Sequence, residues 1–190
     1  MGFTTPSYSL TDLFSRAERG ELQLPDFQRS YIWDVDRVRT LVTSVLRGYP
    51  VGSFLALDTR NTAQRFRPRP LEGVQAGDTQ PGLVLLDGQQ RLTSLFHAFQ
   101  GDGQVHTVDY LGRAITRRFM VDVRKAVSHA PMPVEAVFAV DEHGVVRSHF
   151  GPQIDGGITS RADMLTHGVV PISTLLWKEG ADLLIDLAAE

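Results

Sequence analysis

Residues 83–93 read LVLLDGQQRLT, and this stretch decides how we expect the chain to fold. The apolar run at its start predicts a buried strand, Gly88 predicts a tight turn, and the later apolar spacing predicts a helix that ends near Gly101. The free backbone N–H groups at the start of a helix, together with the positive end of its macrodipole, favour an anion. We therefore expect the turn at Gly88 to bind a phosphate-bearing ligand.

The side chains around this turn suit phosphate chemistry. Gly88 permits a positive φ and a close approach of phosphate, while Gln89 and Gln90 offer amide donors. Arg91 can place two N–H groups on phosphate oxygens, and Asp87 can hold Mg²⁺ or a water molecule. Such a set stabilises phosphoryl charge through positioning and electrostatics. The ordinary alternative is that Asp87 caps the helix and Arg91 pairs with a surface carboxylate.

A second group of polar and aromatic residues lies earlier in the chain, after the segment around Leu24. Gln28 and Arg29 are followed by Tyr31 and Trp33. Aromatic rings can stack on a base, and glutamine and arginine can bind its edge or a phosphate. The alternative for the two aromatic residues is packing against the helix that follows Asp34.

The remaining pattern predicts further helices and strands and a more β-rich C-terminal part. Helices are expected after a capping box at Ser9–Asp12, from Asp34 to Gly48, after Ser160, and from near Ser173. Strands are expected at Leu22–Leu24, Gly52–Leu57, Arg118–Val123, Ala136–Val140 and Val145–His149, the last two joined as a hairpin through Asp141–Gly144. The stretch 61–82, rich in proline and glycine, is expected to be irregular.

Composition sets broad limits on the function. The chain has 190 residues, of which 42% are hydrophobic, and this is enough for one domain with its own core. It contains no cysteine, which excludes disulfides and thiolate metal sites. Apolar runs fall short of the roughly 20 residues that span a bilayer, and no leader pattern is visible. We expect a cytoplasmic protein without a membrane partner. The net charge of −3 argues against binding nucleic acid by bulk electrostatics alone.

Three blocks of the sequence, taken together, resemble a known family. They are Leu24–Trp33, Arg47–Phe54 and Leu86–Thr93, in that order, and the resemblance covers roughly residues 8–99. They resemble the signature blocks of the GmrS-like N-terminal domain of GmrSD-type modification-dependent restriction enzymes, a ParB/sulfiredoxin-like domain. In kind they are closest to the phosphorothioate-sensing protein SspE.

The resemblance implies a compact α/β domain with a short mixed sheet and helices. Such a domain binds and hydrolyses ATP or GTP with Mg²⁺, recognises modified DNA and controls a linked nuclease. The implied catalytic residues are Asp87, Gln89, Gln90 and Arg91, with Mg²⁺ at Asp87. The implied nucleotide-binding residues are Gly88, Thr93, Gln28 and Arg29. The implied residues for DNA and its modification are Gln28, Tyr31, Trp33, Tyr49 and Pro50.

The same resemblance predicts the organisation of the protein. Residues 1–190 are expected to form one sensor domain, with a core at about 8–125 and, over 126–190, a β-rich extension and the start of a further helical part. The histidine pattern of an HNH nuclease is missing from this sequence, so the nuclease is expected in a separate C-terminal domain or subunit. Homo-oligomers are compatible with the sequence.

Two alternatives remain open at this point. The chain could be a ParB-like nuclease that acts on DNA directly, for which Asp26, Asp87 and a metal would have to suffice. It could also be a non-catalytic DNA-binding module whose phosphate site holds the DNA backbone. Two arginine clusters, 65–69 and 117–118, could contact DNA, although solvated arginines are the ordinary interpretation.

Overall fold

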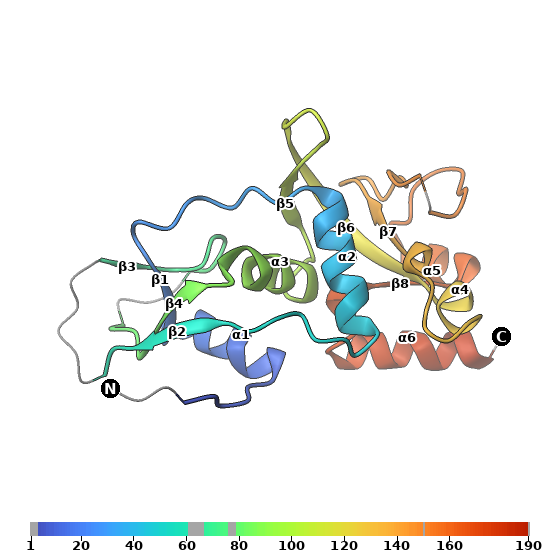
Figure 1. Cartoon of the computed structure of the whole chain (residues 1–190). Helices are drawn as coiled ribbons and strands as arrows, with labels where there is room; N and C mark the ends of the chain where they lie inside the picture. Colours follow the sequence, from blue (N-terminus) through green and yellow to red (C-terminus); the bar gives the residue numbers. More distant parts are fainter. Residues whose placement is uncertain (1–3, 61–66, 76–78, 150, 190) are drawn as a thin grey trace. The chain divides into compact units, whose positions relative to one another are not determined.

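The computed structural model describes residues 4–60, 67–75, 79–149 and 151–189 (Figure 1). These residues form two compact units. Unit 1 comprises Met1–Tyr31 and Ser53–Gln89, and unit 2 comprises Ile32–Gly52 and Gln90–Glu190. The chain thus enters each unit twice, and its second passage from unit 1 to unit 2 occurs between Gln89 and Gln90. No helix among the described residues is both long enough and apolar enough to cross a membrane.

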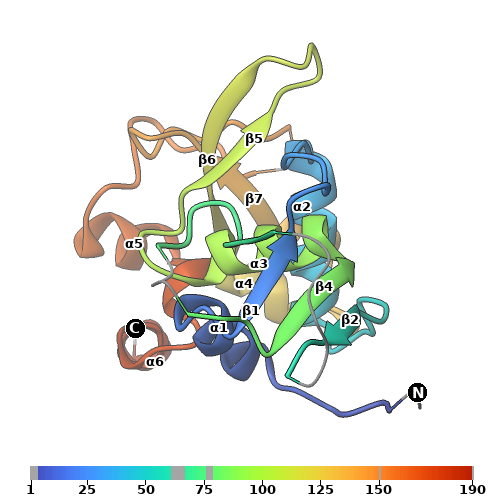
Figure 2. The same cartoon turned by 90° about the vertical axis from the view of Figure 1, so that its left-hand side faces the viewer.

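Unit 1 is a small mixed sheet with one helix, α1 (Leu10–Glu18). Its strands are β1 (Leu22–Pro25), β2 (Leu55–Asp58), β3 (Pro68–Arg69) and β4 (Leu83–Asp87), in the sheet order β2-β4-β1-β3. Figure 2 shows β1 and β4 side by side; they are parallel, whereas β2 and β3 are antiparallel to their neighbours. The expected mixed sheet is therefore confirmed.

The helix of unit 1 begins and packs as its sequence indicates. The Ser9 hydroxyl accepts a hydrogen bond from the Asp12 amide at 3.1 Å, which satisfies one of the free N–H groups of the first turn. Phe14 and Ala17 are buried on the face of α1 that contacts β1. Leu24, at the centre of the sheet, is fully buried as well. Burial of these apolar side chains is the main stabilising contribution in this unit.

Unit 2 contains the other helices and a second sheet. Its helices are α2 (Val35–Leu46), α3 (Gln89–Phe99, whose first residue belongs to unit 1), α4 (Val123–Val127), α5 (Arg161–His167) and α6 (Lys178–Ala189), with 3₁₀ turns at Val134–Ala136 and Ile172–Thr174. Its strands are β5 (Val105–Val108), β6 (Ala114–Asp122), β7 (Val137–Val140) and β8 (Val169–Pro171). β6 is the central strand, because its first half pairs with β5 and its second half pairs with β7 and β8, all antiparallel.

The core of unit 2 lies around β6 and β7. Met120, Phe138, Val140, Ile158 and Val169 form one buried cluster. The helix α2, expected from its apolar stripe, buries side chains of that stripe and contacts β7. Its N-terminus is capped by the carboxylate expected from the sequence, that of Asp34, which accepts from the Arg37 amide at 2.9 Å.

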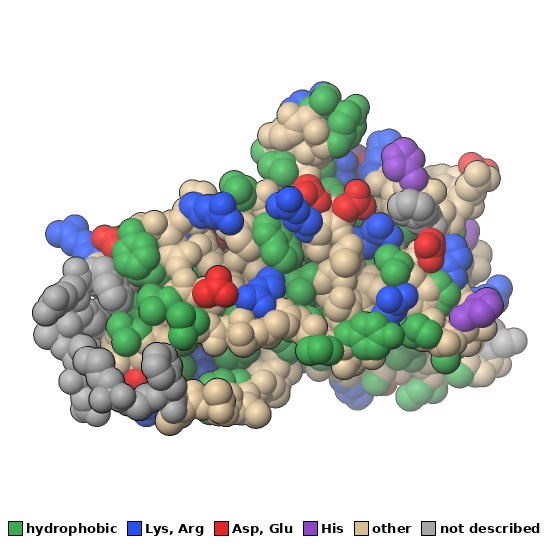
Figure 3. Space-filling view, in the orientation of Figure 1, with side chains coloured by type: hydrophobic (Ala, Val, Ile, Leu, Met, Phe, Trp, Pro, Cys, Tyr) green, Lys and Arg blue, Asp and Glu red, His purple; other side chains and the backbone are tan. Residues whose placement is uncertain are grey.

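The β5–β6 hairpin is the part of unit 2 that the sequence predicted least well. Only its final third was expected as a strand, from Arg118 onward, and β5 was not expected at all. The outer half of the hairpin projects beyond α2 and β7 in Figure 1, and hydrophobic and basic side chains gather at its end in Figure 3. Because this half has little core to face, its sequence lacks the alternation of a half-buried strand.

Two further expectations for unit 2 were wrong in detail. The strand expected at Val145–His149 is reduced to one bridge, between Val140 and Val146, although the turn at Asp141–Gly144 does form. The chain leaves the sheet after Arg147, whose amide still donates to the Ala139 carbonyl. The helix expected from near Ser173 begins only at Lys178, after a 3₁₀ turn.

Candidate functional site

The Gly88 turn has the geometry that the sequence predicted. β4 ends at Asp87 and α3 begins at Gln89, so a single residue reverses the chain from strand to helix (Figure 1). That residue, Gly88, is buried and has φ 97°, a conformation that side chains with a Cβ rarely adopt. The amides of the first turn of α3 therefore follow directly on an exposed carboxylate, Asp87.

Within unit 1, the segment before Tyr31 is tied to the end of β4 by two glutamine side chains. Gln28 Nε2 donates to the carbonyl oxygen of Leu86 at 2.7 Å, and Gln89 Nε2 donates to the carbonyl oxygen of Arg29 at 2.9 Å. Arg69 adds a third bond, from Nη2 to the carbonyl oxygen of Gln28 at 3.1 Å. The structure thus brings Gln28, Arg29 and Gln89 together, and their contact with a nucleotide stays a prediction.

Gln89 leaves one polar atom unsatisfied. The residue is only 3% exposed, and its Oε1 has no hydrogen-bond partner among the residues that the structure describes. A buried acceptor without a donor costs roughly 1–3 kcal/mol. A ligand that brings a hydroxyl, an amine or a bound water to this point would recover that cost.

Thr93, one turn along α3 from Gln89, is fully buried. Its Oγ1 likewise has no hydrogen-bond partner in the described part of the chain. The hydroxyl therefore lies inside the fold, whereas the sequence suggested a direct contact with a nucleotide. Its predicted role in nucleotide binding stays a prediction.

In unit 2, the next two motif residues hold other parts of the backbone. Gln90 is buried, and its Oε1 accepts from the Ile32 amide at 3.0 Å. Arg91 is half-buried, and its Nη1 donates to the carbonyl oxygen of Val51 at 2.6 Å. Arg91 therefore connects the first turn of α3 to the loop after α2, a contact that its assignment as a phosphate ligand did not foresee.

Gly52 makes the contact of Arg91 with Val51 possible. Its φ is 87°, and a Cβ at this position would lie 2.2 Å from Arg91 Nη1. Any other residue would therefore displace the guanidinium from the Val51 carbonyl. The sequence marked Gly52 as part of a motif block and as the start of a strand, and its role beside Arg91 becomes visible once the loop and the helix are seen together.

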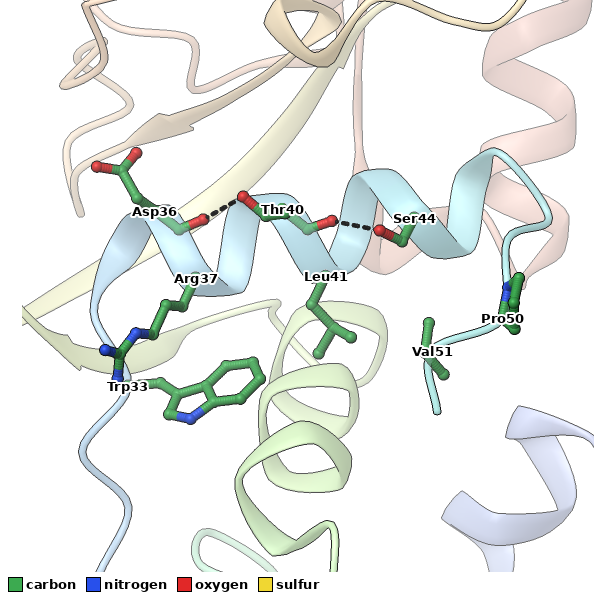
Figure 4. Close-up of a pocket in the computed structure, with 8 residues that line it drawn as sticks. All are labelled: Trp33, Asp36, Arg37, Thr40, Leu41, Ser44, Pro50 and Val51. Atoms are coloured by element: carbon green, nitrogen blue, oxygen red, sulfur yellow. Dashed lines mark hydrogen bonds between the residues drawn. The ribbon is translucent and has the colours of Figure 1, made fainter. Parts of the chain in front are cut away.

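The loop that Arg91 contacts forms one wall of a hollow of about 470 Å³ in unit 2 (Figure 4). The other walls are Trp33 and the exposed side of α2. The lining residues are Trp33, Asp36, Arg37, Thr40, Leu41, Ser44, Pro50 and Val51. Trp33 and Pro50, both expected to recognise DNA, thus line one hollow. The α2 residues were missed, although their i, i+3, i+4 spacing marks one helical face.

The other two aromatic residues expected to contact DNA differ in exposure. Tyr49 is exposed, and the Arg47 guanidinium lies 5.7 Å from the centre of its ring. Arg47 is itself held by a bond of 2.7 Å from Nε to the Met132 carbonyl oxygen. Tyr31 belongs to unit 1 and is buried, with its backbone amide donating to Glu72 Oε2 at 3.1 Å. Stacking of Tyr31 on a base stays a prediction.

The donor set around Asp87 is compatible with Mg²⁺. Mg²⁺ keeps several waters and is held by one or two carboxylates together with phosphates of its substrate, so one exposed aspartate is sufficient on the protein side. Among the residues that the structure describes, no three histidine, aspartate or glutamate side chains gather as a metal site. Asp87 is thus the residue of the motif that can contact the ion. Of the arginine cluster at 65–69, Arg65 lies outside the described residues.

Comparisons with known proteins agree with the motif blocks. Residues 10–146 match the model of the family described as "GmrSD restriction endonuclease, N-terminal domain". The chain is also 36% identical over 95 residues to the uncharacterized protein MJ0686 of Methanocaldococcus jannaschii. That match covers 47% of this chain and 16% of the relative, so the chain spans only a small part of the relative's length. Since the family model covers more than half of the chain, and parts of both units, this chain belongs to the family of GmrSD restriction endonuclease N-terminal domains.

Proposed function

We propose that this chain is the sensor domain of a DNA restriction system, that it hydrolyses a nucleoside triphosphate, and that it reads modified DNA to control a linked nuclease. The observation that carries the proposal is the turn from β4 into α3, in a chain of the GmrSD family. The turn presents Asp87, the Gly88 backbone and the first amides of α3 within five consecutive residues. ATP or GTP with Mg²⁺ is the proposed substrate.

Each polar group at the turn would contact a different part of the nucleotide or its metal ion. The free amides of the first helical turn favour phosphate oxygens, which need donors and negative charge. Asp87 would hold the magnesium ion between protein and phosphates, where bound Mg²⁺ neutralises developing charge. The unsatisfied Oε1 of Gln89 would accept from a metal-bound water or a ribose hydroxyl, because a phosphate oxygen cannot donate to it.

Arg91 provides a physical reason for coupling between nucleotide and DNA. Its guanidinium carries five N–H donors, so the bond to Val51 does not by itself exhaust it. A phosphate that attracts the guanidinium would nevertheless compete with the Val51 carbonyl, and Val51 lines the hollow beside α2. A ligand in the hollow and a nucleotide at the turn would then act on the same hydrogen bond. Such reciprocal influence is what a sensor requires.

The composition of the hollow suits a sulfur-modified phosphate. Trp33, Pro50 and Val51 provide apolar surface for a polarizable sulfur, and Arg37 provides positive charge for the remaining phosphate oxygens. A hydroxymethylated or glucosylated base would require hydrogen-bond partners for its hydroxyl groups, whereas the hydroxyls of Thr40 and Ser44 already donate to carbonyl oxygens of α2 at 2.8 and 2.9 Å. We therefore propose phosphorothioate DNA as the modification that is recognised.

The first experiment measures phosphate release from ATP and GTP in the presence of Mg²⁺. We expect turnover by the wild-type protein and its loss in Arg91→Ala and Gln90→Ala, with circular dichroism showing that both variants stay folded. Arg161→Ala serves as the control, since this arginine is exposed on α5 and pairs with Asp186 on α6. Wild-type rates in both motif variants would contradict the proposal.

Calorimetry and a plasmid-nicking assay, run beside the phosphate-release assay, separate the alternatives. Nucleotide binding by calorimetry without turnover would favour a binding module or a requirement for the nuclease half. Nicking of a plasmid by the 190 residues alone would favour the direct nuclease. Flat calorimetric traces with both magnesium nucleotides would remove the nucleotide site altogether.

A second experiment tests the hollow with duplexes that differ only in one sulfur atom. Gel-shift titrations should show tighter binding of the phosphorothioate duplex than of the plain duplex, and Trp33→Leu should abolish the difference. The chain offers a matched control, because its other tryptophan, Trp177, is also partly exposed but lies outside the hollow. Equal loss in Trp177→Leu would show that the effect is not specific to the hollow.

A further inference from the structure

The outer half of the β5–β6 hairpin ends in a turn that is held rigid by one carboxylate. Asp109 Oδ1 accepts from the amides of Leu111 and Arg113, each at 2.9 Å, and Oδ2 accepts from Arg113 Nε at 2.7 Å. Two backbone bonds add to these: the Asp109 amide donates to the Arg113 carbonyl oxygen, and the Gly112 amide donates to the Asp109 carbonyl oxygen, both at 2.9 Å. Gly112 has φ 78°. The backbone amide of Arg113, foremost among these donors, lowers the pKa of Asp109. The turn therefore keeps its shape without help from the core.

This rigid turn presents two large side chains that are mostly exposed to solvent. Tyr110 is 90% exposed and Leu111 is 60% exposed. Single exposed apolar residues are common and need no explanation. Here, however, five hydrogen bonds hold a turn whose two central side chains are exposed to solvent. A preorganised aromatic side chain loses little entropy when it meets a partner.

The charge of the hairpin indicates the kind of partner. Residues 105–118 contain three arginines and one aspartate, although the whole chain has a net charge of −3. Arg117 Nη1 donates to the Thr116 carbonyl oxygen, and Arg118 Nη2 donates to that of Glu142. Neither arginine is paired with a carboxylate within the part of the chain that the structure describes. Both arginines lie on β6, the strand that follows the turn with the exposed tyrosine.

The surroundings of Arg117 also favour an anionic partner. Arg117 lines a hollow of about 690 Å³ together with His106, Thr116 and Arg147. Asp141 lines it too, but its carboxylate is engaged by Arg147 at 2.9 Å and by two backbone amides. Glu142 is the one carboxylate of the hollow that this network leaves exposed. An anionic partner would contact Arg117 and Arg147 and would be opposed by Glu142.

We infer that the β5–β6 hairpin is a nucleic-acid contact. In this arrangement Tyr110 stacks on a base that is unpaired or partly unstacked, and Arg117, which lines the hollow together with Arg147, binds phosphates of the same strand. Aromatic side chains and arginines on an extended backbone are the usual means of holding exposed bases and phosphates. The inference rests on DNA as the partner in the proposed function, but it depends neither on nucleotide hydrolysis nor on the hollow beside α2.

The stacking contact can be measured by fluorescence anisotropy with a labelled 20-nucleotide strand and its duplex. Tyr110→Ala should weaken binding of the single strand about 5-fold or more, and Tyr110→Phe should restore it. Ile185→Ala is the control, because Ile185 is 65% exposed and lies on the helix α6, which is not part of the hairpin. Wild-type affinity of Tyr110→Ala, or no DNA binding by the wild-type protein, would overturn the inference.

The phosphate contacts are tested by the dependence of the same affinity on salt. Each phosphate contact contributes about 0.7–0.9 to the slope of log affinity against log salt, so Arg117→Gln should lower that slope by about 1. Lys178→Gln, which removes an exposed charge from α6, should leave it unchanged. Glu142→Gln should strengthen binding. If Tyr110→Ala abolishes self-association in sedimentation instead of DNA binding, the hairpin is a contact between copies and the inference fails.

Discussion

Replacing Gly52 with alanine should break the contact that joins Arg91 to the loop after α2. A Cβ at position 52 would lie 2.2 Å from Arg91 Nη1, so the guanidinium must move. A long side chain can move cheaply, but it then loses the bond of 2.6 Å to the Val51 carbonyl oxygen. A hydrogen bond to a charged group is worth about 1.5–3 kcal/mol. The φ of 87° adds about 1–2 kcal/mol for any L-residue.

Gly48 provides a matched control for the backbone term. It also has a positive φ, 67°, but a Cβ there would meet nothing within 4 Å. Gly48→Ala should therefore cost only about 1–2 kcal/mol of unfolding free energy, and Gly52→Ala about 1.5–3 kcal/mol more. In a chain of this size, that difference lowers the melting temperature by roughly a further 3–12 °C. Urea unfolding of the two variants measures it directly.

A double-mutant cycle assigns the difference to Arg91. In an Arg91→Ala background, Gly52→Ala should cost no more than Gly48→Ala, because there is no guanidinium left to displace. The coupling free energy should be about 1.5–3 kcal/mol. Equal costs for Gly48→Ala and Gly52→Ala, together with additivity in the cycle, would refute the reasoning that Gly52 exists to admit Arg91.

Three further predictions concern stability. Hydrogen bonds from the backbone amides of Thr159 and Ser160, at the start of α5, lower the pKa of Asp163 to about 2. The stabilising effect of this carboxylate is complete above its ordinary pKa of 3.8 and is lost as the pH falls toward 2. Asp163→Asn should therefore make the free energy of unfolding depend less on pH in that range. Phe138→Ala, in the core of unit 2, should cost about 3–5 kcal/mol in urea unfolding, whereas the exposed Val127→Ala should change it by less than about 0.5 kcal/mol. Gln28→Ala removes the bond to Leu86 and should cost about 0.5–1.5 kcal/mol, and no change would show that water replaces the bond.

Local signals explain which elements could be predicted from the sequence. α2 was predicted because its cap, its apolar stripe and its C-terminal glycine lie within 15 residues of one another. The turn at Gly88 was predicted for the same reason, since an apolar run, a glycine and a helical pattern follow directly on one another. In both cases a few neighbouring residues determine the structure, and no distant partner is needed.

Pairing between distant residues explains what the sequence did not give. β5 pairs with the first half of β6 across the Asp109–Arg113 turn. Val105 and Thr107 are buried, but β5 has only four residues, and none of residues 114–117 in β6 is buried, so side-chain alternation carries little information there. Val146 reaches the sheet through one bridge, and the described residues that follow it, up to His149, form no strand. β3 has only two residues and depends on β1, far away in sequence, for its existence. No local pattern specifies such partners.

The candidate site shows the same limit, with a consequence for its function. The sequence assigned Arg91 to phosphate and left Gly52 without a role, because forty residues separate Arg91 from Val51 in the chain. The structure shows that a missing side chain at position 52 admits the guanidinium to the loop that carries Pro50 and Val51. Two motif blocks that look independent in the sequence are thus joined by one hydrogen bond. A change in either block therefore alters the other. An Arg91 substitution removes both the charge of the guanidinium and its bond to Val51, whereas Gly52→Ala displaces the guanidinium from Val51 and keeps its charge. Comparing the two variants in turnover and in DNA binding separates the effect of the charge from the effect of the bond.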